Sequence, residues 1–181
     1  RFKNAKLSYY RGDFEWAQGQ LVVLKASTSE LIANDALDLS VFIMDNLGLD
    51  TSSYPMEMYA KADLLYFQNR WDEALNTLDS ITMAFPAHDL SDDIAYSRAE
   101  IFIKQKRYDE AEEELLLVID KHADDILGDD AHFLLAKLYD ETLNPPAEAA
   151  EYYKQLLFNY KDSIYVIEAR KRFRELQKEQ G

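Results

Sequence analysis

Two stretches of this sequence, NRWDEALNTL at residues 69–78 and KRYDEAEEEL at residues 106–115, show one pattern twice, thirty-seven residues apart. Each contains a basic residue, an aromatic residue, Asp-Glu-Ala and then a leucine four positions after the alanine. A single reaction centre rarely needs two copies of a segment, whereas an architecture built from stacked units does. The pair therefore predicts a repeat protein.

The pattern extends to four segments that share a helical spacing. From the first residue of each segment, small or apolar side chains recur at i+3, i+7 and i+10, which is one face of an α-helix. The four sets are Phe14, Ala17, Leu21 and Leu24; Trp71, Ala74, Leu78 and Ile81; Tyr108, Ala111, Leu115 and Val118; Pro146, Ala149, Tyr153 and Leu156. We expect these faces to be buried, and Trp16 and Trp71 to be packing residues.

A second amphipathic stretch precedes each of the last three segments and carries a small residue near its middle, namely Ala62, Ala99 or Ala136. Small side chains on facing helices let two backbones approach closely. The sequence therefore predicts an all-α solenoid of antiparallel helix pairs. About ten helices are expected, near residues 2–11, 13–27, 29–47, 55–69, 71–85, 90–105, 108–122, 127–142, 146–160 and 163–179.

One interval departs from the regular spacing. Phe14 and Trp71 are fifty-seven residues apart, about one repeat plus twenty, and the additional helix at 29–47, ending at Gly48, accounts for the excess. We expect a single domain over residues 1–181, with 163–179 as a C-terminal capping helix. Because Arg1 is not an initiator residue, we interpret the chain as a fragment of a longer one. Phe2, Tyr9 and Tyr10 are expected to meet solvent or a preceding repeat, which would permit self-association through the first helix.

The composition excludes several classes of function. The formal net charge is −14, from 34 acidic and 20 basic residues, so a nucleic-acid partner is disfavoured. The absence of cysteine removes thiolate metal sites and cysteine nucleophiles. No apolar run reaches the length of about 18 residues that a membrane-spanning helix needs.

The order of small residue, aromatic residue and a further alanine resembles the tetratricopeptide repeat, a helix–turn–helix unit of about 34 residues. The residues that carry the resemblance are Ala62, Trp71, Ala74, Leu78 and Pro86; Ala99, Phe102, Tyr108, Ala111 and Leu115; Ala136, Tyr139, Ala149 and Tyr153. The repeats are three or four residues longer than that norm and look like the bacterial cell-envelope branch of the family. The resemblance implies a periplasmic or outer-membrane-associated protein, with the cytoplasm left open.

The sequence offers little for catalysis. It contains no nucleophile elbow, phosphate-binding loop or zinc-protease motif. The stretch KHADDILGDDAH at residues 121–132 has two histidines and four aspartates, which suit a divalent cation. The same aspartates stand where helix ends would place them, and Glu112, Glu113 and Glu114 are expected on a solvated face. We therefore predict no enzyme, no metal and no cofactor.

In this family the first helix of each pair lines a concave groove, and that resemblance selects nine positions counted from the central small residues. They are Tyr59, Asp63 and Tyr66; Tyr96, Glu100 and Ile103; Phe133, Lys137 and Asp140. Aromatic and acidic side chains suit a peptide or protein segment with apolar and basic anchors. We expect a protein-binding scaffold. The alternatives are a glycan- or small-ligand-binding module that uses the groove aromatics, and packing of these rings against neighbouring helices.

Overall fold

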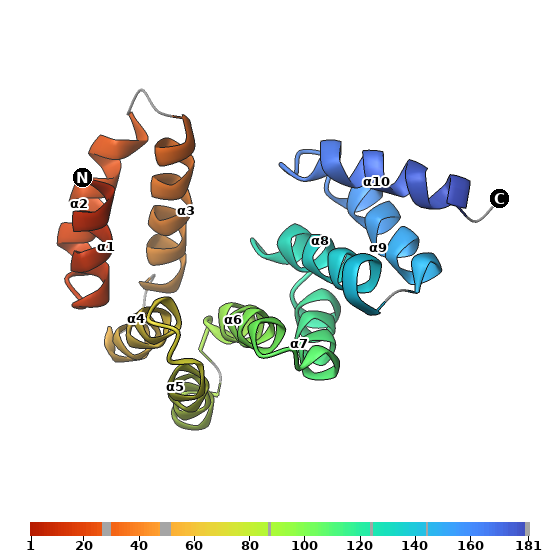
Figure 1. The fold of residues 1–181 in the computed structure, drawn as a ribbon. Coiled ribbons are helices and arrows are strands. Elements are labelled where there is room, and N and C mark those ends of the chain that lie inside the picture. Colours follow the sequence, from red (N-terminus) through yellow and green to blue (C-terminus); the bar gives the residue numbers. More distant parts are fainter. Residues whose placement is uncertain (27–29, 48–51, 87, 124, 144, 180–181) are drawn as a thin grey trace. The chain divides into compact units, whose positions relative to one another are not determined.

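A computed structural model describes residues 1–26, 30–47, 52–86, 88–123, 125–143 and 145–179 (Figure 1). Within these ranges the protein contains ten α-helices and no strand, which confirms the predicted all-α class. The helices are Phe2–Tyr10 (α1), Phe14–Lys25 (α2), Glu30–Leu47 (α3), Tyr54–Phe67 (α4), Trp71–Ala84 (α5), Ser91–Lys104 (α6), Tyr108–Lys121 (α7), Gly128–Leu138 (α8), Pro146–Asn159 (α9) and Val166–Glu179 (α10). The predicted helix end at Gly48 lies outside the described residues.

One turn geometry joins the two helices of a pair. Gly12, Asn69 and Lys106 have positive φ angles of 78°, 58° and 61°. In each turn, the amide of the next residue donates to the carbonyl oxygen five positions earlier, as in a Schellman motif. These hydrogen bonds join Asp13 to Ser8, Arg70 to Leu65 and Arg107 to Phe102, at 2.9, 2.9 and 2.8 Å. Each turn is followed directly by a helix that begins with an aromatic residue.

The same turns explain why a basic residue and Asp-Glu-Ala recur. Arg70 Nε and Nη2 donate to the two carboxylate oxygens of Glu73 at 2.7 and 2.5 Å. Arg107 pairs with Glu110 in the same way across both of its oxygens. The arginine stands just before the second helix, and the glutamate lies in its first turn, near the positive end of the helix dipole. Because the pairs are exposed, they define turn geometry more than they add stability.

The chain divides into two compact units, Arg1–Ser91 and Asp92–Gly181. In the first unit, α1 packs on α2 and α4, α2 packs on α3, and α4 packs on α5. A row of rings crosses its core: Tyr9 contacts Phe14 and Phe42, each at 6.0 Å between centroids, and Phe42 contacts Tyr59 at 5.0 Å. The predicted faces are buried, since Ala17, Leu21, Ala74, Leu78 and Ile81 have almost no exposed surface.

In the second unit, α7 packs on α8, α8 on α9 and α9 on α10. Ala95 and Ala99 of α6 belong to the same core as Ala111, Leu115 and Val118 of α7. The apolar face predicted for the last helix packs on the core, because Ala169 and Leu176 of α10 are buried and Val166 and Phe173 pack against the same cluster, while the role of this helix as a cap stays a prediction. It starts at Val166 rather than residue 163, since the residues before it form turns.

A single inserted residue changes the third pair. The central alanine of the first helix and the alanine at the fourth position of the second helix are twelve residues apart in two pairs, but Ala136 and Ala149 are thirteen apart. The helix predicted over 127–142 accordingly ends as α-helix at Leu138 and continues as a π-helical turn, Tyr139–Leu143 (η1). A π-helical turn accommodates one extra residue without breaking the helix, and such turns are frequent at functional sites.

Several expected side-chain environments are wrong. Glu114 is half-buried beside the Arg98 guanidinium, 3.6 Å away, rather than solvated, and Pro146, the first residue of α9, is exposed. Trp16 is 70% exposed, because the face that α2 buries contains Phe14 and Ala17 and leaves Trp16 outside it. Tyr9 is only 1% exposed, because the additional helix α3 covers it through Phe42. Glu112 is half-buried rather than solvated, because the Tyr139 hydroxyl donates a hydrogen bond to it. With Tyr9 covered, self-association through α1 loses one of the residues on which it was based and stays a prediction.

Candidate functional site

The nine predicted groove residues all lie on the first helix of a pair, or on its π-helical continuation. Tyr59, Asp63 and Tyr66 are on α4 in the first unit; Tyr96, Glu100 and Ile103 are on α6, Phe133 and Lys137 on α8, and Asp140 on η1, all in the second unit. Spacings of four and three residues keep each triplet on one side of its helix. The structure therefore brings together the members of each triplet.

In the first unit, the α4 triplet is partly used for packing. Tyr59 is 9% exposed and its ring lies against Phe42, so this ring is a core residue. Asp63 and Tyr66 are half-buried. Burial raises the pKa of the Asp63 carboxyl, and the Lys6 ammonium partly opposes that shift. The Tyr10 hydroxyl, whose pKa is raised by burial and then by the Asp63 charge, is a neighbour of the same carboxyl.

In the second unit, the three residues on α6 are half-buried, and Phe133 on α8 is covered. Phe133 is 8% exposed and stacks on Tyr165, with centroids 4.2 Å apart and planes 11° apart. The Tyr165 hydroxyl donates to Asp130 Oδ1 at 2.6 Å, which holds the stacked ring in place. Lys137 lies with its ammonium 5.7 Å from the Phe133 centroid, a cation–π distance.

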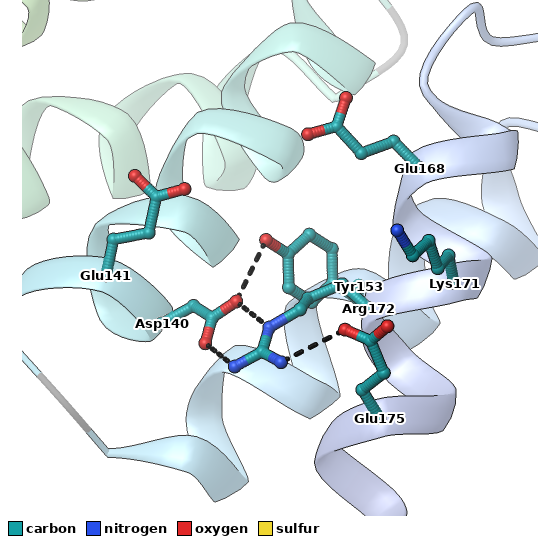
Figure 2. A pocket seen from close by; sticks show the side chains of 7 residues that line it. All are labelled: Asp140, Glu141, Tyr153, Glu168, Lys171, Arg172 and Glu175. Atoms are coloured by element: carbon teal, nitrogen blue, oxygen red, sulfur yellow. Dashed lines mark hydrogen bonds and ion pairs between the residues drawn. The ribbon is translucent and has the colours of Figure 1, made fainter.

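Asp140 is the most constrained of the nine. Arg172 of α10 donates to it through Nε at 2.6 Å and Nη2 at 2.8 Å, a bidentate ion pair. The Asp140 side chain is 6% exposed. Tyr153 of α9 places its hydroxyl 3.4 Å from the same carboxylate. Three elements, η1, α9 and α10, therefore meet at this carboxylate (Figure 2).

A pocket of about 330 Å³ opens beside this ion pair. Its lining comes from η1, α9 and α10 and consists of Asp140, Glu141, Tyr153, Glu168, Lys171, Arg172 and Glu175. Figure 2 shows Glu141 and Glu168 on opposite sides of the opening. Of these seven residues, Asp140 alone is among the nine predicted groove positions. The sequence could have indicated Arg172 as well. This residue falls between Ala169 and Leu176, next to the buried face of its helix, where a cation needs a carboxylate partner.

Other chemistry is sparse in the described residues. No three histidine, aspartate or glutamate side chains there form a group that suits a metal ion. In the acidic stretch, His122 Nδ1 lies 2.9 Å from Asp125 Oδ2, and His132 Nδ1 lies 2.7 Å from the carbonyl oxygen of Gly128. Asp124 of that stretch lies outside the described residues. No described helix combines the length and the apolarity that crossing a membrane requires.

The repeated turn, the paired helices and the central alanines define a helical-repeat protein. Two models of the tetratricopeptide repeat match the chain, one over residues 59–126 and one over residues 130–163, and the chain belongs to the tetratricopeptide repeat family. Members of this family are typically non-enzymatic scaffolds for protein–protein interaction, so a protein partner is the general expectation for this chain.

Solved structures agree with this fold. The TPR domain of P58(IPK) is similar with a TM-score of 0.56 and 17% identity, over 98% of this chain and 44% of that one. MamA (41-end) from Desulfovibrio magneticus RS-1 is similar with a TM-score of 0.52 and 17% identity, over 98% and 92%. A MamA RS-1 double mutant has a TM-score of 0.50 and 15% identity, over 88% and 96%. This chain thus spans less than half of the P58(IPK) domain.

At these identities the likeness is one of fold, and it supports the predicted helical solenoid. A search of curated proteins found no match to this chain.

Proposed function

We propose that this protein is a non-enzymatic scaffold that binds an extended peptide or protein segment on the first-helix face of its repeats. One observation carries the proposal: the first helices α4 and α6, each within its own unit, place a half-buried aromatic and a half-buried acidic side chain on that face, and the two acidic residues are at equivalent positions of the repeat. These are Asp63 and Tyr66 on α4 and Tyr96 and Glu100 on α6. Partly exposed rings next to carboxylates recognise segments that alternate apolar and basic side chains.

The charge of the chain supports the same partner class. A net charge of −14 attracts basic segments and accelerates their encounter with the surface, while it repels a phosphate backbone. We therefore propose a partner segment that carries lysine or arginine together with aromatic or aliphatic anchors, and no nucleic-acid partner.

The glycan-binding alternative has less support. It needs open ring faces on which sugars stack, and Tyr59 is covered by Phe42. Phe133, the aromatic residue at the equivalent position of α8, is covered by Tyr165. Two of the equivalent aromatic positions are thus occupied by intramolecular packing. We propose no sugar ligand.

The repeats in this chain are thirty-seven and thirty-eight residues long, where the family norm is about 34. We propose, from the likeness of this longer repeat to cell-envelope members of the family, that the protein acts in the bacterial envelope. Fractionation of cells that express the full-length protein tests this location. Recovery in the periplasm or with the outer membrane agrees with the proposal, and recovery in the cytoplasm alone overturns it.

Selection from a displayed library of random twelve-residue peptides tests the binding face. We expect enriched peptides to contain basic and aromatic residues, and to bind the variant Tyr66→Ala/Tyr96→Ala/Glu100→Lys at least tenfold more weakly than the parent, because the lost contacts are those of interface anchors. A Glu113→Lys variant, which changes an exposed carboxylate on the second helix α7, is the control and should bind normally. Peptides that bind both variants as tightly as the parent would assign the site to another face.

A further inference from the structure

The pocket beside Asp140 has a shape and charge that suggest a definite ligand. Its walls are the π-helical turn η1 and the helices α9 and α10, all within the second unit. A volume of about 330 Å³ is at the small end of ligand pockets, which suits one long side chain better than a cofactor. Asp140 is at once a wall of this pocket and one of the nine predicted groove positions, so the pocket adjoins the proposed binding face.

The charges around the pocket do not balance. Asp140, Glu141, Glu168 and Glu175 line it, against the two cations Lys171 and Arg172. Arg172 is already engaged, because it donates to Asp140, to Glu175 at 3.2 Å and to Glu179 at 3.3 Å. Its guanidinium is therefore fully neutralised. The Glu141 carboxylate lies 3.7 Å from the Lys137 ammonium, but this pair is largely exposed and contributes little, so Glu141 and Glu168 are the carboxylates that a further cation can reach.

The interior of the pocket supplies a fixed, neutral polar group. Tyr153 is buried, and its ring packs edge-on against Phe133 at 6.2 Å between centroids. Burial and the nearby Asp140 and Glu141 carboxylates raise the pKa of the Tyr153 hydroxyl, so it stays protonated at neutral pH. In Figure 2 this hydroxyl lies between the Glu141 and Glu168 sides of the opening. A cation that enters the pocket thus meets carboxylates on two sides and the Tyr153 hydroxyl below.

We propose that this pocket binds an arginine side chain of the partner segment, with Glu141 and Glu168 as the paired carboxylates and Tyr153 beneath the guanidinium. The inference rests on the proposed function, since it names an anchor of the same binding face. The bidentate pair of Arg172 and Asp140 shows that the adjoining wall already holds one guanidinium in this way. Arginine fits better than lysine because a planar guanidinium can donate hydrogen bonds to carboxylates on two of its edges at once.

Nuclear magnetic resonance titration of the full chain with N-acetyl-arginine methylamide tests the proposal at low salt. We expect saturable shifts at Glu141, Tyr153, Glu168 and Lys171. N-acetyl-citrulline methylamide has nearly the same shape without the charge and should leave these signals unchanged. Equal shifts with citrulline, or shifts spread over the acidic surface without saturation, would overturn the assignment.

Two variants with opposite expected effects sharpen the test. Glu141→Gln/Glu168→Gln should weaken the binding of N-acetyl-arginine methylamide by about three- to tenfold. Glutamine keeps the shape of the two side chains but removes their charges. Lys171→Met should strengthen the binding of the same ligand by about two- to threefold, because a cation that competes for the carboxylates is removed. Glu148→Gln/Glu151→Gln on α9 removes two charges outside the pocket and is the matched control. Equal weakening in the control, or no response to Lys171→Met, contradicts the proposal.

Three further outcomes separate this inference from its premise. If the selected peptides bind the parent and Glu141→Gln/Glu168→Gln equally well, the proposed scaffold function is supported and the proposed arginine pocket is contradicted. If capped arginine causes specific shifts but the selection yields no binding peptide, the proposed pocket is supported and the proposed peptide-binding function is contradicted. Free arginine that binds much more tightly than capped arginine would identify a small metabolite as the ligand and overturn the partner-segment source.

Discussion

Arg172 of α10 donates two hydrogen bonds, of 2.6 and 2.8 Å, to Asp140 of η1, thirty-two residues earlier in the sequence. Asp140 is almost fully covered, so the arginine neutralises a carboxylate that lacks access to water. The pair also joins the capping helix to the third repeat at the one place where that repeat contains an inserted residue. It both stabilises the second unit and forms one wall of the pocket.

Loss of this arginine should destabilise the second unit. We expect Arg172→Ala to lower the free energy of unfolding by about 2 kcal/mol, because a covered carboxylate is left without its cation. Urea unfolding followed by circular dichroism measures the change. Arg174→Ala, at an exposed position of the same helix, should stay within about 0.5 kcal/mol of the parent.

A double-mutant cycle isolates the pair. Asp140→Asn combined with Arg172→Ala should cost less than the sum of the two single changes, because removal of one partner already leaves little interaction to lose. Additive costs would show that the two residues do not stabilise one another.

Two glycines should respond in opposite directions to alanine. A Cβ at Gly128 would lie 2.3 Å from the carbonyl oxygen of Ala123 and 2.6 Å from the Tyr160 hydroxyl. Gly128→Ala should therefore lower the free energy of unfolding by about 2 kcal/mol, since backbone must move. Gly19→Ala in α2 meets no atom within 4 Å and should raise it by about 1 kcal/mol through helix propensity. The reverse order of the two midpoints in urea would contradict the packing described at Gly128.

The turn at Lys106 contains a correctable strain. Its φ of 61° is left-handed, which costs an ordinary L-residue about 1 kcal/mol and costs glycine almost nothing. We expect Lys106→Gly to raise the free energy of unfolding by about 0.5–1 kcal/mol, measured by thermal and urea unfolding. Asn69→Gly should gain less, because asparagine tolerates this conformation. Glu113→Gly, at an exposed position in the interior of α7, should lose about 1 kcal/mol, and a gain there would show that the effect is not specific to the turn.

Acid should weaken the second unit through His132. Burial lowers the pKa of this imidazole, although its hydrogen bond to Gly128 and the nearby Asp129 carboxylate oppose the shift. The unfolded chain takes up a proton as pH falls below about 6.5, while the folded imidazole stays neutral. The stability present above pH 6.5 is therefore lost as pH falls from that value toward the lowered folded pKa.

Comparison of the parent with His132→Asn over this range checks the assignment. Asparagine keeps a donor for the Gly128 carbonyl but does not titrate, so the variant should lose less stability between pH 7.5 and 5.5 than the parent does. The same loss in both proteins would show that other groups cause the acid sensitivity.

Part of the candidate site was predictable and part was not. Helical periodicity predicted that each triplet shares one side of its helix. The choice of that side as the binding face came from the family resemblance and stays a proposal. The burial of Tyr59 by Phe42 and of Phe133 by Tyr165 was not predictable, because the covering residue belongs to another element of the same unit in each case. For the same reason the pocket could not be foreseen, although an arginine on the apolar face of α10 indicated a buried carboxylate partner.

The sequence by itself determined the helices, their turns and the repeat, because these depend on residues within about five positions of one another: the amide of Arg107 bonds to Phe102, and its side chain to Glu110. Only the tertiary structure decided which members of the repeated face are exposed, and which carboxylate receives Arg172. Burial of a side chain depends on elements that are distant in the chain, and no local spacing specifies them.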